Sequence, residues 1–366
     1  MINNFFYFAK SKWKNSSSRF VKYYVVFLFI IFIIFIKYYN VFSSSVYNEI
    51  TTPSIIFWKE SFSNFNFNKE LINNDDKILY LKNKTEFYLK LRKNFLRKNH
   101  VVYNESNIIS YQDKLNWLVI HESPQYKSFL VDKLKLRDYS KRILGKDICV
   151  PLLKIYENEK DIKFGELPNK FVLKLNHGYG MNIICEDKSK LDFEKVLERL
   201  KYWKNINYGL LTTEFQYLYV NRKIFAEEFL SRDLIDYKIF CFNGEPKFIQ
   251  IRKLLDSKNH IYLHNHYDTN WKLTDIESGL PGYIREPNIK IEKPKNLKLM
   301  LKYAKLLSQE FVFIRVDFYE YKNKIFLGEL TFTPTNGFAK WKNTKQNIYI
   351  ANMMNLTRIK KYLFNK

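Results

Sequence analysis

The sequence predicts an α+β protein preceded by a single N-terminal transmembrane helix. Three observations lead to this fold class. An unbroken apolar run occupies residues 25–36. Strand-like runs of alternating apolar and polar residues then occur in pairs around short polar turns. Segments with apolar residues at helical spacing lie between them, and a chain of 366 residues is long enough to bury a sizeable core.

The apolar run is the centre of a predicted membrane anchor, residues 23–39. It is shorter than the roughly 20 apolar residues that span a bilayer, but the Lys37 side chain is long enough to reach the interface. A signal-peptide core or an interfacial helix is the alternative, although no small-residue cleavage site stands out. The preceding tail, residues 1–22, is basic and contains no acidic residue. The positive-inside rule therefore predicts a cytoplasmic tail, with the folded part across the membrane.

The chain after the anchor divides into two predicted parts. Residues 40–105 are rich in Ser, Asn, Phe and Lys without a sustained period, which is typical of a stalk leading into peripheral helices. Residues 106–366 form the predicted main domain. Its first elements are a helix that starts at Ser110 and a second helix, residues 126–144, that Gly145 ends.

The stretch FVLKLNHGYGMNIICED, residues 171–187, predicts two strands joined by a glycine-containing loop. Lys174 is close to the end of the first strand, and Gly178 and Gly180 allow backbone N–H groups to approach an anion closely. The stretch matches neither the Walker pattern nor the dinucleotide fingerprint, because the loop leads into a strand and not into a helix. A phosphate-binding loop and an ordinary hairpin with a surface lysine both remain open.

An amphipathic helix, residues 193–203, and an acidic strand follow this loop. The strand, KIFAEEFL, contains Glu227 and Glu228 next to each other. Adjacent strand residues face opposite sides of a sheet, so at least one of these acids is expected to face inward and to need a partner.

The next pair of strands lies in YKIFCFNGEPKFIQI, where Asn243-Gly244 predicts a tight hairpin turn. Asp236 and Lys238 lie at the start of its first strand. A helix opened by Pro294 then leads to the last strands.

The segment FIRVDFYEYKNKIFLGELTFTP, residues 313–334, predicts a hairpin around a polar turn. With the turn centred at residue 323, Asp317 lies opposite Glu329. Arg315 then lies opposite Thr331 on the same face. The apolar residues between them point to the other face, toward the core. These are Val316, Phe318, Leu330 and Phe332.

The opposed carboxylates of this hairpin repel each other unless a positive charge lies between them. A divalent metal would supply that charge. Oxygen ligands suit Mg²⁺ or Mn²⁺, which bridge carboxylates to substrate phosphates. Alternatively, Arg315 and nearby lysines neutralise a solvated pair.

Composition adds weaker constraints. The net charge of +24 favours anionic partners, but excess lysine normally forms solvated faces, and we expect no nucleic-acid partner. The three cysteines are far apart and predict no disulfide framework. His260, His264 and His266 share strand parity but lack a clear fourth metal ligand, so ordinary strand positions are the preferred interpretation.

The order of these elements resembles the ATP-grasp fold, in which two α+β lobes hold ATP between them. The sequence is most similar to the TupA-like (teichuronopeptide biosynthesis) family of surface-polysaccharide gene clusters. The similarity covers roughly residues 107–345. It is carried, in order, by DKLKLRDY, LPNKFVLKLNHGYGMNII, DYKIFCFNGEPKFIQ, HYDTNWK, KPKNL and FIRVDFYEYKNKIFLGELTFTP.

The resemblance implies a nucleotide site. Arg137 and Lys174 would contact the ATP phosphates beneath the glycine loop, Glu227–Leu230 would be the interlobe hinge at the adenine, and Asp236 and Lys238 would lie near the ribose and phosphates. The full set of implied ATP contacts is Arg137, Lys174, Gly178, Gly180, Glu227, Glu228, Leu230, Asp236 and Lys238.

The resemblance also implies a metal site at the hairpin. Asp317 and Glu329 would hold Mg²⁺, with Mn²⁺ as the alternative, and Arg315 would stabilise an oxyanion in the transition state. The wider superfamily usually has asparagine where this chain has Thr331. A hydroxyl is a poorer magnesium ligand than an amide carbonyl, so Thr331, or nearby Asn336, would serve a weaker site.

The implied reaction is ATP-dependent carboxylate–amine ligation. ATP phosphorylates a carboxylate, with Arg315 and Lys174 acting on the developing charge, and an amine then attacks the acylphosphate to form an amide. No side-chain nucleophile is needed. A uronic-acid sugar and an amino acid are candidate substrates.

Two other functions are compatible with parts of the sequence. A glycosyltransferase-like type II membrane enzyme would use Asp317 and Glu329 to bind manganese and a nucleotide sugar, but the chain has no Asp-x-Asp motif. A non-catalytic basic module binding acidic glycans or lipid would leave these carboxylates and Lys174 incidental. ATP is plentiful in the cytosol, whereas the positive-inside rule places the main domain across the membrane. The expectation is therefore a single-pass membrane protein, with the side of the membrane on which the catalytic domain works left open.

Overall fold

The computed structural model describes residues 83–122, 124–256, 261–280 and 283–359, all within the unit Ser61–Lys366. The predicted tail and anchor, residues 1–39, and most of the predicted stalk lie outside the described residues. Among the helices that are described, none combines the length and the apolar character needed to cross a bilayer.

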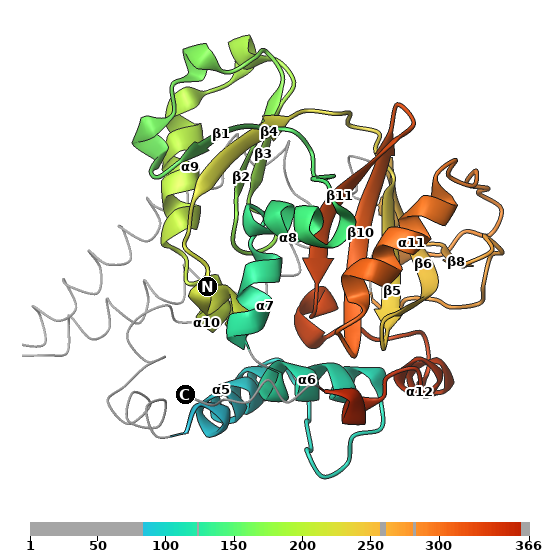
Figure 1. Cartoon of the computed structure of the whole chain (residues 1–366). Helices are drawn as coiled ribbons and strands as arrows, with labels where there is room; N and C mark the ends of the chain where they lie inside the picture. Colours follow the sequence, from blue (N-terminus) through green and yellow to red (C-terminus); the bar gives the residue numbers. More distant parts are fainter. Residues whose placement is uncertain (1–82, 123, 257–260, 281–282, 360–366) are drawn as a thin grey trace, which may run out of the picture. The chain divides into compact units, whose positions relative to one another are not determined.

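Two mainly antiparallel β-sheets form the framework (Figure 1). The four-stranded sheet has the order β1-β4-β2-β3, and the seven-stranded sheet has the order β11-β10-β5-β6-β7-β9, with β8 also paired to β6. The strands are β1 Leu152–Tyr156, β2 Phe171–Leu175, β3 Asn182–Cys185, β4 Ile224–Glu228, β5 Asp236–Phe242, β6 Glu245–Asp256, β7 Ile261–Leu263, β8 His266–Asp268, β9 Tyr283–Ile284, β10 Phe313–Tyr321 and β11 Lys324–Thr331.

Helices cover both sheets. The α-helices are α5 Lys84–Lys98, α6 Tyr111–His121, α7 Pro124–Val131, α8 Lys135–Leu144, α9 Phe193–Asn205, α10 Tyr208–Thr212, α11 Leu297–Ser308 and α12 Thr344–Ala351. Short 3-10 helices are η1 Glu159–Asp161, η2 Phe164–Glu166, η3 Lys188–Lys190, η4 Phe215–Tyr219, η5 Pro334–Gly337 and η6 Leu356–Arg358. The chain enters the four-stranded sheet after α8 and passes to the seven-stranded sheet between β4 and β5. Both sheets therefore belong to α+β lobes, as the sequence predicts.

Alternation along the strands separates a core face from a polar face of the larger sheet. Ile239, Ile249 and Val316 are fully buried in a core that α8 and α11 cover, through residues such as Leu136 and Met300 (Figure 1). The smaller sheet packs on α9 in a second core. The face of the larger sheet opposite the α8 and α11 core carries the charged residues of the site.

Of the two helices predicted at the start of the main domain, the first is confirmed and the second is wrong. Ser110 caps α6 as predicted, since its Oγ accepts a hydrogen bond from the backbone N–H of Asp113 at 3.1 Å. The second predicted helix is broken into α7 and α8. Asp132 Oδ1 causes the break by accepting a hydrogen bond from the backbone N–H of Leu134 at 2.9 Å, which starts a new helix. Gly145 ends α8 with a φ of 74°, as predicted.

The predicted Asn243-Gly244 hairpin turn is confirmed, and the three cysteines are free. Asn243 and Gly244 join β5 to β6 with φ values of 53° and 84°, both left-handed, as a type I′ turn requires. The three cysteines form no disulfide.

Candidate functional site

The hairpin of β10 and β11 has the predicted register at residues 315–317, and its pairs are displaced by one residue from Phe318 to the turn. Asp317 lies opposite Glu329, and Arg315 lies opposite Thr331. The turn itself is half a residue away from the predicted centre, because the two left-handed residues Lys322 and Asn323 form it. A bulge between Asp317 and Phe318 restores the register by inserting Gly328 as an extra residue in β11. Its lack of a side chain is needed, because a Cβ there would lie 2.8 Å from the ring of Tyr319.

Arg315 supplies the positive charge between the two carboxylates. Its Nε and Nη2 donate to the two oxygens of Asp317 at 2.7 Å each. Nη2 also donates to Glu329 Oε1 at 2.9 Å and to Thr331 Oγ1 at 3.1 Å. The geometry therefore supports neutralisation of the pair by Arg315, whereas the predicted solvation of the pair is wrong for Asp317, which is 3% exposed.

Lys238 of β5 extends this charge network. Its Nζ donates to Asp317 Oδ2 at 2.7 Å and lies 3.5 Å from Asp236 Oδ2. Burial alone would raise the pKa of Asp317, but Arg315 and Lys238 outweigh it and lower that pKa to about 2. Asp317 is therefore ionised throughout the neutral range and holds two cations.

The donor set at the hairpin fits a magnesium ion in part. Asp317, Glu329 and Thr331 place three oxygen donors on one face, and Mg²⁺ commonly takes one or two carboxylates plus phosphate and water oxygens. Both described contacts of Glu329 use Oε1, which leaves Oε2 for a ligand. Within the described ranges no group of three or more His, Cys, Asp or Glu side chains comes together. Asn336, the other predicted donor, instead accepts hydrogen bonds from Arg92 through its side chain and its carbonyl group.

A second ion pair lies on the four-stranded sheet. Lys174 of β2 contacts Glu227 Oε1 of the neighbouring strand β4. Glu227 is buried and Glu228 is exposed, so the predicted inward-facing acid is Glu227. Leu230 is half-buried in the β4–β5 connection between the two sheets, where the resemblance implies the hinge.

Lys133, which the sequence reasoning missed, contacts the β2–β3 loop of the four-stranded sheet. It lies in the break between α7 and α8, and its Nζ donates to the carbonyl oxygen of Gly178 at 2.7 Å. Burial lowers the pKa of Lys133, and the nearby charges that also act on it include Glu329, Lys174 and Glu227. The electrostatic environment of Lys133 therefore includes Glu329 of the larger sheet and Lys174 and Glu227 of the smaller sheet.

The loop between β2 and β3 is a hairpin that packs against the site. Gly178 and Gly180 have left-handed φ values of 87° and 74°. A Cβ at Gly178 would lie 2.7 Å from the ring of Tyr208, so only glycine fits there. The backbone of this loop is an ordinary hairpin, which is one of the two predicted interpretations. The hydrogen bond from Lys133 places the Gly178 carbonyl group beside a cationic side chain.

Arg137 lies farther along α8 and is engaged with the start of the four-stranded sheet. Its Nε is 2.9 Å from Asp147 Oδ2, and its Nη1 donates to the carbonyl oxygen of Val150 at 2.7 Å. Contact with ATP phosphates therefore stays a prediction for Arg137.

A buried polar cluster lies beside the site, after the end of β11. Arg92 of α5 is fully buried and donates to Asn116, Thr213 and Asn336. Glu214 is 6% exposed and accepts a hydrogen bond from Thr333 Oγ1. Burial raises the pKa of Glu214 to about 7, although Thr333 and Arg92 act in the opposite direction.

This raised pKa predicts a pH-dependent stability. Between pH 4.5 and about 7, Glu214 is protonated in the folded protein and ionised in the unfolded chain. The free energy of unfolding therefore falls as pH rises through this range. The shift corresponds to about 3 kcal/mol at most. Denaturant unfolding of the parent and Glu214→Gln at pH 5 and pH 7.5 measures it. The glutamine variant should lose less stability than the parent over this interval, and equal losses would contradict the assignment.

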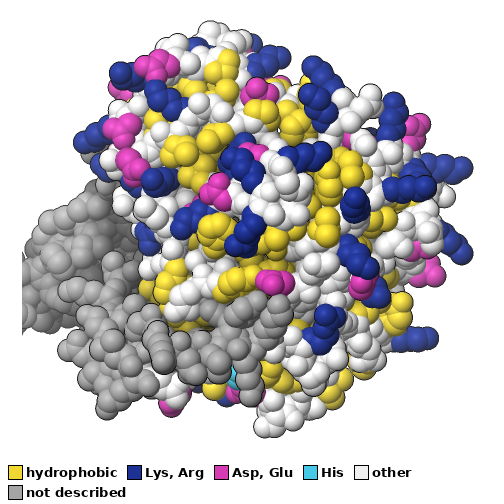
Figure 2. Space-filling view, in the orientation of Figure 1, with side chains coloured by type: hydrophobic (Ala, Val, Ile, Leu, Met, Phe, Trp, Pro, Cys, Tyr) yellow, Lys and Arg dark blue, Asp and Glu magenta, His cyan; other side chains and the backbone are white. Residues whose placement is uncertain are grey.

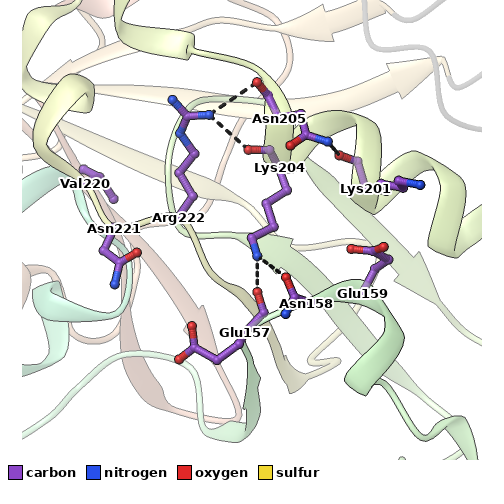
Figure 3. Close-up of a pocket in the computed structure, with 9 residues that line it drawn as sticks. All are labelled: Glu157, Asn158, Glu159, Lys201, Lys204, Asn205, Val220, Asn221 and Arg222. Carbon is purple, nitrogen blue, oxygen red and sulfur yellow. Dashed lines mark hydrogen bonds between the residues drawn. The ribbon is translucent and has the colours of Figure 1, made fainter.

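A cavity of about 570 Å³ lies away from these groups, between η1, the end of α9 and the segment before β4 (Figure 3). Its lining includes none of the predicted site residues. Lys204 binds Glu157 and Asn158, and Arg222 binds carbonyl oxygens at the end of α9. These cations therefore hold the lobe together, and we assign the cavity no ligand.

Lysine and arginine side chains are spread over the described face in Figure 2, with acidic side chains among them. This distribution is typical of solvated faces and does not mark one extended basic patch.

No curated protein is significantly similar to the chain. Among solved structures, D-alanine–D-alanine ligase from Bacillus anthracis is 17% identical at a TM-score of 0.40, covering 82% of this chain and 88% of its own. An ADP complex of N5-carboxyaminoimidazole ribonucleotide synthetase is 17% identical at a TM-score of 0.38, with coverages of 67% and 57%. This chain thus spans less than two thirds of the synthetase.

The sequence match to a family is more extensive. The family described as TupA-like ATPgrasp matches residues 113–355. That segment contains both sheets, the Arg315–Asp317–Glu329 network, Lys133, and the Lys174–Glu227 pair. By this match, the chain belongs to the TupA-like ATP-grasp family.

Proposed function

We propose that the protein is an ATP-dependent carboxylate–amine ligase that works through an acylphosphate. The observation that carries the proposal is the Arg315 network with Asp317 and Glu329, within a chain of an ATP-grasp family. Lys133 adds to it, because the charges of Glu329 and Lys174 both act on its pKa. In this reaction a carboxylate oxygen of the substrate attacks the γ-phosphorus of ATP, and ADP leaves. The amine nitrogen then attacks the acyl carbon, and inorganic phosphate leaves with its P–O bond intact.

The side chains divide this work by their charge. Lys133 and Lys174 face the phosphates, where fixed cations stabilise the charge of the transferred group. Asp317 and Glu329 hold the magnesium ion, which supplies charge neutralisation at the phosphates when bound. Arg315 lies between these carboxylates and donates to the oxyanion of the tetrahedral intermediate. Lys238 keeps Asp317 ionised and oriented.

The proposal includes a cellular context. The protein is anchored in the membrane by residues 23–39 and modifies a surface glycan, with a uronic acid as the carboxylate substrate and an amino acid as the amine. Support for the anchor is the apolar run of residues 25–36. Membership of an ATP-grasp family leaves the nucleotide-sugar alternative without support.

Magnesium-dependent binding of a non-hydrolysable ATP analogue to the full chain tests the nucleotide site. Lys174→Met is expected to weaken this binding by about tenfold or more, since a charge-assisted hydrogen bond contributes about 1.5–3 kcal/mol. Lys170→Met is the matched control, because Lys170 is an exposed lysine just before the same strand. Isothermal titration calorimetry gives both dissociation constants, and circular dichroism reports folding.

Hydroxylamine trapping then tests the acylphosphate. The parent should form a hydroxamate and ADP from ATP, magnesium and an acidic sugar. A folded parent that binds no magnesium–ATP would overturn the ligase proposal, as would equal binding by Lys174→Met and the parent.

A further inference from the structure

The outer face of helix α5 carries a one-sided charge. The chain from residue 87 to residue 104, which contains most of this helix, has five lysine or arginine residues and no aspartate or glutamate. Acidic residues make up about a tenth of the whole chain. The segment is therefore locally basic even for a basic protein.

Helical periodicity sorts these cations onto two faces of α5. Lys90, Lys93 and Arg97 are three and four residues apart, so they form one stripe on the helix surface. All three side chains are exposed, whereas Arg92 lies on the buried face of the helix. The α5 stripe, Lys90, Lys93 and Arg97, extends about 10 Å along the helix axis.

Cations of the α5 stripe remain available to an external anion. In the part of the chain that the structure describes, no carboxylate contacts Lys93 or Arg97. Arg97 makes one long contact within the helix, to Asn94 Oδ1 at 3.5 Å. Glu86 lies at the N-terminal end of the same face and is held by Asn83, whose Nδ2 donates to Glu86 Oε2 at 3.4 Å.

An exposed apolar side chain lies just beyond the C-terminal end of the stripe. His100 turns the chain after α5 with a left-handed φ of 58°, and the backbone N–H of Val101 then donates to the carbonyl oxygen of Leu96 at 2.9 Å. The next residue, Val102, is 92% exposed. The connection from α5 to α6 projects away from both sheets (Figure 1). Basic side chains next to an exposed apolar one are typical of helices that bind a bilayer interface.

Helix α5 is also the first described element after the predicted membrane anchor (Figure 1). The predicted stalk of residues 40–105 includes it, so the chain leads from the apolar run at residues 25–36 through this stalk into α5. An anchor on the same chain raises the effective concentration of the bilayer surface around α5. Contacts that are weak one at a time can therefore hold the helix against that surface.

We propose that the α5 stripe binds the anionic headgroups of the membrane, with Val102 at the interface. A lysine or arginine close to an anionic leaflet strengthens binding by about fivefold, and this attraction falls off within a Debye length. The inference rests on the membrane anchoring in the proposed function and adds an orientation to it. Arg92, on the opposite face of α5, holds Asn336 after the end of β11. Docking of α5 therefore turns this side of the catalytic domain toward the bilayer.

The competing explanation is that the stripe is an ordinary solvated face. In that case the reactivity of its lysines does not depend on the lipid. An acidic polymer is the other occupant that a basic stripe can bind, and heparin serves as its probe.

Lysine acetylation, read by mass spectrometry, measures the contact in the full chain. The protein is added to vesicles of phosphatidylcholine, or to vesicles that also contain anionic phosphatidylglycerol. Lys93 is expected to react at least about fivefold more slowly on the anionic vesicles. Lys170, an exposed lysine just before β2, should react equally on both. In 1 M NaCl the Debye length is about 3 Å, so the protection of Lys93 should disappear.

Two matched variants separate the stripe from the overall charge. Lys90→Gln/Arg97→Gln keeps Lys93 as the probe and should remove most of its protection. Lys298→Gln/Lys302→Gln removes two exposed cations, four residues apart, from α11 and should leave the protection unchanged. Magnesium–ATP binding within about threefold of the parent shows that each variant is folded.

Flotation of the same samples reports the anchor separately. If the chain floats with both kinds of vesicle but Lys93 reacts equally on them, the α5 docking is overturned and the anchor stands. Flotation with anionic vesicles alone, lost in Lys90→Gln/Arg97→Gln, overturns the anchor and supports the docking. A chain that floats with neither overturns both. Protection of Lys93 by heparin but not by anionic vesicles overturns lipid as the occupant.

Discussion

Replacing Asp317 with asparagine is expected to lower kcat/KM for amide formation by about 100- to 1,000-fold, the effect of removing one preorganised electrostatic group from an active site. Asp317 carries two roles in this structure. Its carboxylate is a proposed magnesium ligand, and it accepts hydrogen bonds from Arg315 and Lys238 at 2.7 Å. The amide is neutral, so the variant loses affinity for the metal and leaves both cations without their closest anion. ADP release in the presence of magnesium, ATP and an acidic sugar measures the loss.

The same substitution should destabilise the fold. Removing one partner of a buried ion pair typically costs about 3–5 kcal/mol, because the remaining charge stays in a poorly solvated position. Asp317 is 3% exposed, whereas the Glu329 side chain is 26% exposed. Glu329→Gln should therefore reduce turnover with a smaller loss of unfolding free energy. If Asp317→Asn retained parental turnover while folded, the hairpin would not be the metal site.

The hairpin shows how far sequence reasoning reaches when two local rules act together. Period-two alternation and a polar turn were enough to predict that Asp317 faces Glu329 and that Val316 and Phe318 enter the core. The predicted turn was half a residue out of place. The pairing of residues 315–317 was nevertheless predicted correctly, because the bulge at Gly328 adds one residue to β11 and compensates for the displaced turn. Side chains close to the turn, such as Tyr319, pair one position away from the prediction.

Lys133 shows where such reasoning stops. Apolar spacing predicted one continuous helix from residue 126, and only the hydrogen bonds of Asp132 reveal the break. Asp132 Oδ1 accepts from Leu134 in its own chain segment and from Asn176 Nδ2 in the β2–β3 loop, both at 2.9 Å. The second contact joins residues far apart in sequence and becomes visible only in three dimensions. Asp132, three residues before the first helical residue Lys135, was the one available signal, as a candidate N-cap inside the run.

The surroundings of Arg252 were not predicted, for a related reason. The predicted strand ended at Ile251, one residue before Arg252, whereas β6 continues to Asp256. Tyr262 and Tyr283 come from short strands whose pairing the residue pattern did not specify. The histidines drew attention instead as a candidate metal group. In the structure the described pair, His264 and His266, is buried, and burial lowers the pKa of His266 to about 3. The preferred interpretation, an ordinary strand position, is confirmed for His266, which lies in β8, and is wrong for His264, which lies just after the end of β7. The stacking of His264 on Tyr283 depends on the β7–β9 pairing, which the residue pattern did not specify.

Replacing Arg92 with methionine is expected to cost about 3–5 kcal/mol of unfolding free energy, although Arg92 lies outside the family segment of residues 113–355. Its guanidinium donates to Asn116 Oδ1 at 2.8 Å, to Thr213 Oγ1 at 2.7 Å and to the carbonyl oxygen of Asn336 at 2.7 Å. Methionine fills part of the volume but leaves these buried acceptors unsatisfied. Arg97→Met is the matched control, because Arg97 is an exposed arginine on the same helix.

The loss should extend from stability to turnover. Thr335, Asn336 and Gly337 all have left-handed φ values, 51°, 53° and 75°, and two of them are not glycine. Such strain persists only where surrounding contacts hold it, and Arg92 supplies those contacts directly at Asn336. This loop follows β11, which ends at Thr331, so its release should displace the end of β11. Guanidinium unfolding and ADP release, compared between Arg92→Met and Arg97→Met, test both effects. Parental stability and turnover in Arg92→Met would mean that α5 only covers the domain, whereas loss of both would make α5 part of the catalytic unit.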